Sequence, residues 1–117
     1  KTDEHLWRTL NNKQGQWILR QREDHKSEYG MTGVINGSIQ RVFVDRMFVE
    51  NKLRWIIDYK TGTPLTNLDP DTFYKTQIEL YKNQLERYQY IAKNIYSEPI
   101  KTGLFFTATA TFKEVTL

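Results

Sequence analysis

The chain has 117 residues, 38% of them hydrophobic and 14% aromatic, which is typical of one globular domain with one core and argues against disorder. It has no cysteine and two histidines, so a disulfide framework, a Cys-ligated zinc site and a His-rich metal site are excluded. The net charge of +3 is compatible with a nucleic-acid partner but is too small to hold DNA tightly by itself.

The first quarter of the chain places short apolar groups among polar residues. Leu6, Trp7 and Leu10 share one face of a short predicted helix. Residues 17–19 are predicted to begin a short strand, and we expect Trp17 in the core. Residues 23–27 are predicted to form a charged loop.

Three predicted strands follow. Residues with strand-like alternation fill three segments, 27–36, 39–49 and 53–60. Asn36-Gly37 is a strong turn signal between the first two segments, and Asn51-Lys52 separates the second from the third. Residues 55–57 are apolar on both faces, as in a central buried strand, and Trp55 is expected in the core.

The remainder of the chain predicts one long helix and one further strand. Gly62, Pro64 and Pro70 indicate a loop over residues 61–71, and Asp69 or Asp71 can cap the following helix. Apolar residues recur at helical spacing over residues 71–96, and Pro99 ends the helix. A strand over residues 103–112 is predicted to turn into a short edge strand at 114–117. The order β, β, β, α, β predicts an α/β or α+β fold with a mixed sheet.

Three charged residues in the predicted sheet point to chemistry. Asp58 and Lys60 lie two residues apart in one strand, so they project to the same side, past its apolar part. If residues 51–52 join two hairpin strands, Asp45 comes near Asp58. Two close carboxylates favour a divalent, oxygen-seeking metal such as Mg²⁺ or Mn²⁺. A lysine beside that metal can orient a water and stabilise charge on a phosphate, as phosphodiester cleavage requires.

The same residues also fit plainer interpretations. Asp58 and Lys60 could form a solvated pair where a strand becomes a loop, and Asp45 with Arg46 an exposed pair on an edge strand. Four cations recur along the predicted hairpin and either line a phosphate path or belong to solvated faces: Arg41, Arg46, Lys52 and Arg54. We favour the solvated interpretation for Lys52 and Arg54.

Taken in order, three motifs resemble the nuclease domain of RecB/AddA-type proteins, the C-terminal part of some UvrD-like helicases and a member of the PD-(D/E)XK superfamily. The motifs are Asp45-Arg46, Asp58-Tyr59-Lys60-Thr61 and Gln84-Leu85-Glu86-Arg87-Tyr88. The match covers roughly residues 17–108 and includes Ser27-Glu28-Tyr29. It implies an α/β fold with a restriction-endonuclease-like core, in which helices flank a central mixed sheet.

The resemblance also assigns a metal site. It implies that Mg²⁺ or Mn²⁺ is bound by Asp45, Asp58 and the backbone carbonyl of Tyr59, with Lys60 as the catalytic lysine. Glu28 would complete the acidic cluster, and Glu23 is the alternative residue for that role.

On the predicted long helix, Gln84 and Tyr88 lie four residues apart and share one face. The resemblance implies catalytic and DNA-binding roles for both and a DNA contact for Arg46. The alternative interpretation is that Gln84 and Tyr88 are ordinary surface and core residues of an amphipathic helix, with Tyr88 in the packing. The family also carries a metal-ligating histidine on an upstream helix. Neither His5 nor His25 has the expected sequence context, so we expect that helix to precede Lys1.

The implied function is that of a cytoplasmic, metal-dependent DNA exonuclease in double-strand break repair and recombination. Residues 1–117 would form a single nuclease domain, a C-terminal fragment of an ATP-dependent helicase-nuclease. This stretch has no Walker A motif, so a helicase domain elsewhere would feed it single-stranded DNA. A RecC/AddB-type subunit is a further candidate partner, and no membrane is expected.

Two other functions fit the sequence. The chain could be a catalytically inactive nuclease-fold module that binds DNA or docks a partner. Against this, inactive members of the family usually lose the residues at Asp58 or Lys60, and this chain retains both. A free-standing restriction-type endonuclease would need its own sequence-reading element, for which 117 residues leave little room.

Overall fold

The computed structural model describes residues 13–20, 22–64 and 69–117, together with all their side chains except that of Glu23. These residues form a five-stranded mixed sheet and two helices. In chain order the elements are α2 (Lys13–Leu19), β1 (Glu23–Ile35), β2 (Ser38–Glu50), β3 (Leu53–Lys60), α3 (Pro70–Lys93), β4 (Ile100–Phe106) and β5 (Thr111–Val115). The strand order follows the sequence, and only β3 and β4, joined through α3, run parallel. The predicted mixed sheet is confirmed.

Most of the predicted strands are confirmed, but the start of the described chain differs. Strand β3 has the predicted bounds, and turns join the strands at residues 36–37 and 51–52. The strand predicted at residues 17–19 is wrong, because this segment belongs to helix α2. The loop predicted at residues 23–27 is also wrong, because β1 begins at Glu23 and pairs with β2 through an irregular register. The helix predicted from Leu6 to Leu10 lies outside the described residues.

The long helix α3 is confirmed with slightly different ends. It begins after Asp69, whose side chain accepts a hydrogen bond from the Thr72 N–H, so Asp69 rather than Asp71 is the cap. The strand predicted at residues 103–112 is two strands, β4 and β5, separated by a turn, and the edge strand starts earlier than predicted. Neither of the helices in the described ranges has the length and apolar composition needed to cross a membrane.

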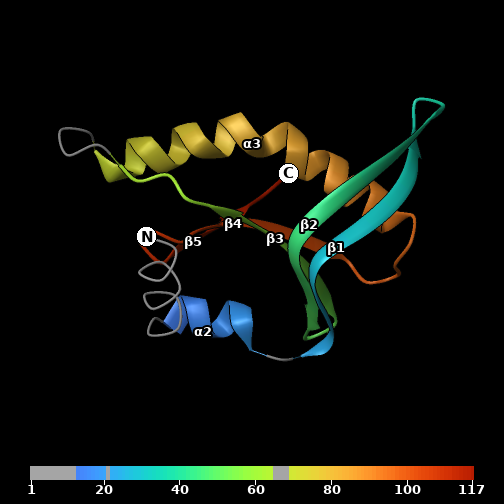
Figure 1. Cartoon of the computed structure of the whole chain (residues 1–117), viewed down its shortest axis with the longest axis horizontal. Helices are drawn as coiled ribbons and strands as arrows, with labels where there is room; N and C mark the ends of the chain where they lie inside the picture. The colour runs from blue at the N-terminus through green and yellow to red at the C-terminus, as the bar shows by residue number, and fades with distance from the viewer. Residues whose placement is uncertain (1–12, 21, 65–68) are drawn as a thin grey trace.

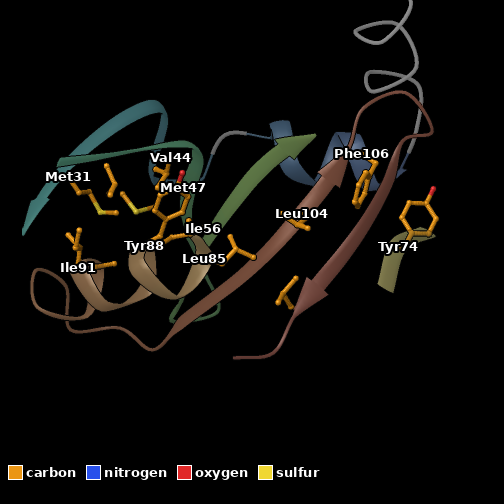
Figure 2. Close-up of a cluster of buried hydrophobic side chains, with 13 residues drawn as sticks. Met31, Val44, Met47, Ile56, Tyr74, Leu85, Tyr88, Ile91, Leu104 and Phe106 are labelled. Carbon is orange, nitrogen blue, oxygen red and sulfur yellow. The ribbon is translucent and has the colours of Figure 1, made fainter. Parts of the chain in front are cut away.

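The sheet lies between the two helices, with α3 on one face and α2 on the other (Figure 1). The larger core cluster packs the sheet against α3 and includes Met47, Ile56 and Leu85 (Figure 2). A second cluster packs Ile18 of α2 against the opposite face. Trp17 and Trp55 are partly buried against this second cluster with their rings edge to face, 5.2 Å apart. The alternation of the strands therefore supplies two cores.

The β1–β2 hairpin extends well beyond the rest of the sheet. Strand β2 pairs with β3 only over residues 46–50, whereas its pairing with β1 continues to the turn at residues 36–37. We call residues 29–44 the hairpin arm. A Cβ atom on Gly33 would lie 2.9 Å from Cγ1 of Ile91, so the arm packs directly on the C-terminal half of α3.

A cation of strand β3 is buried, contrary to expectation. Arg54 is 3% exposed and lies between the carboxylates of Asp24 and Glu98, at 2.9 Å and 3.0 Å. Its guanidinium also stacks over the Tyr96 ring, 3.6 Å from the centroid. The prediction that Arg54 is solvated is wrong, because carboxylates distant in sequence compensate its charge. Lys52 is exposed, as predicted.

Candidate active site

Asp45 and Asp58 meet where β2 separates from β3. The last paired residues of this ladder are Arg46 and Ile57, and continuing the register places Asp45 opposite Asp58. The backbone ladder does not continue past Arg46 and Ile57. The Tyr59 N–H instead donates a 2.7 Å hydrogen bond to a side-chain oxygen of Asp45. Val44 and Met47, three residues apart, face the same core, so the strand alternation is interrupted here. The interruption directs the Asp45 side chain toward β3.

The Asp58 carboxyl group is buried and is only 5% exposed. The pKa of Asp58 is raised to about 6, chiefly by burial and also by the neighbouring Asp45 carboxyl, against the opposing effect of the Lys60 ammonium. Two carboxyl groups with one lysine leave an excess of negative charge in a poorly solvated place. A bound cation relieves that excess.

Lys60 connects the acidic pair to helix α3. Its ammonium lies 2.8 Å from Oδ2 of Asp58 and donates a 3.5 Å hydrogen bond to Oε1 of Gln84. The same ammonium lies 3.6 Å from the centroid of the Tyr81 ring, a close cation–π contact. Lys60 is therefore held between a carboxylate, an amide oxygen and an aromatic face.

Gln84 and Tyr88 present one face of α3 to this lysine. The Gln84 amide donates a 2.6 Å hydrogen bond to the Tyr88 hydroxyl while its oxygen accepts from Lys60. The Tyr88 ring is part of the main core (Figure 2), and burial raises the pKa of its hydroxyl, helped by the negative charge of Asp58. The core interpretation of Tyr88 and its proximity to the site both hold.

Glu28 does not join this cluster. Its side chain is exposed, its backbone φ is +49°, and in the described part of the chain it has no ion pair with a site residue. The alternative, Glu23, has no described side chain, and His5 lies outside the described residues. His25 is exposed on β1. The structure thus brings together five predicted side chains, Asp45, Asp58, Lys60, Gln84 and Tyr88.

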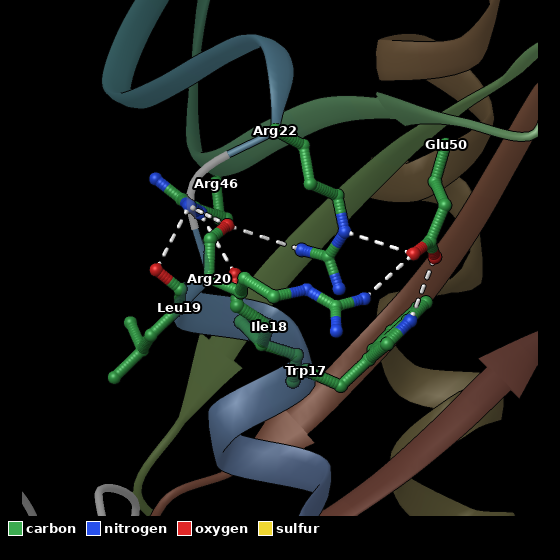
Figure 3. Close-up of polar contacts among 7 residues, drawn as sticks. All are labelled: Trp17, Ile18, Leu19, Arg20, Arg22, Arg46 and Glu50. Atoms are coloured by element: carbon green, nitrogen blue, oxygen red, sulfur yellow. Dashed lines mark hydrogen bonds and ion pairs between the residues drawn. The ribbon is translucent and has the colours of Figure 1, made fainter.

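Arg46 lies next to Asp45 in sequence but points into the opposite side of the fold. It is 4% exposed and donates hydrogen bonds to the backbone oxygens of Ile18, Leu19 and Arg20 at 2.9–3.3 Å (Figure 3). These carbonyls lie at the C-terminal end of α2, where no further helical turn supplies N–H donors and a cation is favourable. The exposed-pair interpretation of Arg46 is wrong, and its donors are not available for the predicted DNA contact.

Sequence reasoning missed Tyr81 as part of the site. Tyr81, Gln84 and Tyr88 are spaced i, i+3 and i+7, so they form one stripe along α3, and that spacing was visible in the sequence. The missing information was which side chain faces the stripe. The parallel β3–α3–β4 connection brings Lys60 there.

The donor chemistry fits one small divalent cation. Within the described ranges, no three Asp, Glu, His or Cys side chains gather closely enough to hold a metal by themselves. Mg²⁺ commonly uses one or two carboxylates and keeps several waters, so the adjacent Asp45 and Asp58 are a sufficient set. The Tyr59 backbone lies beside the Asp45 carboxylate, which accepts a hydrogen bond from its N–H group.

Comparison with known proteins provides no further assignment. No protein-family model matches the chain, and no curated protein is significantly similar to it.

Proposed function

We propose that this domain is a metal-dependent deoxyribonuclease with a restriction-endonuclease-like core. The observation that supports it best is the convergence of Asp45, Asp58 and Lys60 where β2 separates from β3. Gln84 and Tyr88 reach the same point from α3. A solvated Asp58–Lys60 ion pair at a strand end would not need burial of Asp58, the second carboxyl of Asp45 or the Gln84–Tyr88 hydrogen bond behind the lysine.

Asp45, Asp58 and the Tyr59 carbonyl would hold Mg²⁺ or Mn²⁺, which supplies a deprotonated water and neutralises phosphate charge when bound. The Lys60 ammonium offsets negative charge on the phosphate in the transition state and donates a hydrogen bond to the attacking water. In the hydrolysis, a water oxygen bonds to phosphorus while the bond to the departing sugar oxygen breaks, and that oxygen takes up a proton. Gln84 and Tyr88 hold Lys60 in place and orient the substrate.

We place the domain in an ATP-dependent helicase-nuclease that acts in DNA break repair and recombination. The order and spacing of the three motifs support this placement. The helicase part would deliver single-stranded DNA, and the domain would degrade it as an exonuclease in the cytoplasm. A RecC/AddB-type subunit is the expected partner of the parent protein.

The decisive experiment measures cleavage of labelled linear single- and double-stranded DNA with Mg²⁺ or Mn²⁺ and with EDTA. We expect metal-dependent cleavage that Lys60→Ala lowers by at least about a hundredfold, because charge stabilisation at the phosphate is lost. Lys82→Ala, which removes an α3 lysine with no role in the cluster, is the matched control and keeps full activity. Equal cleavage by Lys60→Ala and the parent protein would show that the centre is elsewhere.

A second function has one observation in its favour. Glu28 lies outside the acidic cluster, so among the described residues only Asp45 and Asp58 contribute carboxylates to that cluster. A catalytically inactive module that binds DNA or docks a partner would have this composition. Binding of DNA without cleavage under any metal condition would favour this module over the nuclease.

A further inference from the structure

A groove of about 520 Å³ lies beside the candidate active site, between the hairpin arm and α3. Ile35 and Gln40 line it from the arm, and Asn83, Gln84 and Arg87 line it from the helix. Gln84 belongs to both places, because its amide also contacts Lys60 and Tyr88. A molecule in the groove would therefore contact the residue that hydrogen-bonds to Lys60.

The groove offers hydrogen-bonding groups and one free cation. Gln40 and Asn83 each carry an amide that can both donate and accept hydrogen bonds. In the part of the chain that the structure describes, no carboxylate forms an ion pair with Arg87, whose guanidinium is exposed on α3. Glu86 also lines the groove and is its one acidic residue. The amides suit base edges, and the cation suits a phosphate.

Tyr90 adds an accessible aromatic face. It lines the groove from the last turns of α3 and is 51% exposed, so one face of its ring is open to a ligand. Exposed aromatic rings beside cations are the usual means of holding single-stranded nucleic acid, since every base can stack on them. A paired base is covered by its neighbours and its partner, so a duplex does not offer a base to this position.

We propose that this groove binds one or two nucleotides of single-stranded DNA adjacent to the scissile phosphate. Arg87 contacts a phosphate, Tyr90 stacks on a base, and Gln40 with Asn83 contacts base edges or sugar. The proposal rests on the proposed function for its substrate class and deepens it: the groove assigns the preference for single strands to residues outside the catalytic cluster.

The test measures equilibrium binding of a fluorescein-labelled oligothymidine and of a matched duplex by fluorescence anisotropy, with EDTA so that no cleavage occurs. We expect the single strand to bind more tightly than the duplex. Arg87→Ala should weaken single-strand binding about tenfold and lower the slope of log affinity against log salt by about 0.7, the value for one lost phosphate contact. Tyr90→Ala should also weaken it about tenfold, while Tyr90→Phe retains binding.

Lys93→Ala is the matched control, because it removes one cation from the end of the same helix outside the groove. If Lys93→Ala and Arg87→Ala have the same effect, binding reflects net charge and the groove proposal is overturned. Tyr90→Ala that binds like the parent protein overturns it as well. The two proposals can fail separately. If the anisotropy changes occur as expected but no Lys60-dependent cleavage is found, the nuclease function fails while the groove proposal stands.

Discussion

Burial of the Asp58 carboxyl carries an electrostatic cost. Its folded pKa of about 6 exceeds the value of 3.8 for a free aspartate, chiefly because the group is buried. Between pH 4 and pH 6 the folded protein therefore holds a proton that the unfolded chain has released. The stabilisation is complete below pH 4 and is lost as the pH rises to about 6, so the metal-free protein is less stable at neutral pH.

The first prediction concerns this pH dependence. In EDTA, the free energy of unfolding from urea titrations should fall between pH 4 and pH 6. Asp45→Asn should make that fall smaller, because the amide oxygen of the variant can still accept the Tyr59 N–H but no second charge lies beside Asp58. An NMR titration of the Asp58 carboxyl checks the cause directly. An unchanged titration midpoint in Asp45→Asn would contradict the assigned coupling.

At the scale of elements, helix α2 is short and depends on a strand residue for its C-terminal end. Arg46 of β2 donates to the backbone oxygens of its last two residues and to that of Arg20, which follows it (Figure 3). Arg46 also donates to the Ser27 hydroxyl. Glu50, further along β2, binds Trp17 and Arg20 of the same segment. Helix and strand are therefore joined at two places, directly behind the candidate site.

The second prediction follows from this junction. Arg46→Ala should lower the free energy of unfolding by about 3 kcal/mol, because buried carbonyls lose their donor. Arg46→Lys should recover only part of it, since an ammonium lacks the planar fork that reaches several oxygens. Chemical denaturation measures both variants. Arg41→Ala, an exposed cation of the same strand, is the control and should change stability by less than about 1 kcal/mol.

The third prediction concerns the hairpin arm and α3. Gly33→Ala should destabilise the protein by about 1–3 kcal/mol, because the new Cβ would lie too close to Ile91. In an Ile91→Ala background the same change should cost much less, since the crowding γ-carbons are gone. A double-mutant cycle by urea denaturation measures this coupling. The exposed Val34, substituted by alanine, should show no coupling to Ile91→Ala.

At the scale of the whole molecule, the candidate site joins three elements. The acidic pair comes from β2 and β3, and the residues that hold Lys60 come from α3. A cation bound to both carboxylates would therefore tie together segments far apart in sequence. Because only the folded chain brings them together, binding must stabilise the fold.

The fourth prediction is a metal-linked stability that depends on pH. At pH 8 and a Mg²⁺ concentration 100 times the Kd, the folded state should gain about 2.7 kcal/mol. At pH 5 the gain should be much smaller, because the Asp58 pKa of about 6 leaves this ligand protonated. Thermal denaturation with Mg²⁺ or EDTA measures the difference. A similar Mg²⁺ gain in Asp58→Asn at pH 8 would place the metal elsewhere.

Local patterns anticipated much of the fold and part of the site. Period-two alternation and the Asn-Gly turn predicted the β-hairpin, and residues 53–60 were correct to the residue. Asp58 and Lys60 were predicted to share a side because strand geometry requires it. Segments whose structure depends on distant partners were predicted wrongly: residues 17–19 form a helix end held by Arg46, and residues 23–27 form a strand paired with β2.

By itself, the sequence determined the order of elements from β1 to β4, the side of β3 that carries Asp58 and Lys60, and the stripe along α3, because these follow from backbone periodicity. Only the tertiary structure decided which predicted residues meet. The register of β2 on β3 brought Asp45 beside Asp58. Glu28 of β1 stayed exposed outside the cluster, and Arg46 turned into the interior, where it binds the end of α2. Register, burial and the crossover through α3 are set by contacts between distant segments, which local periodicity does not contain.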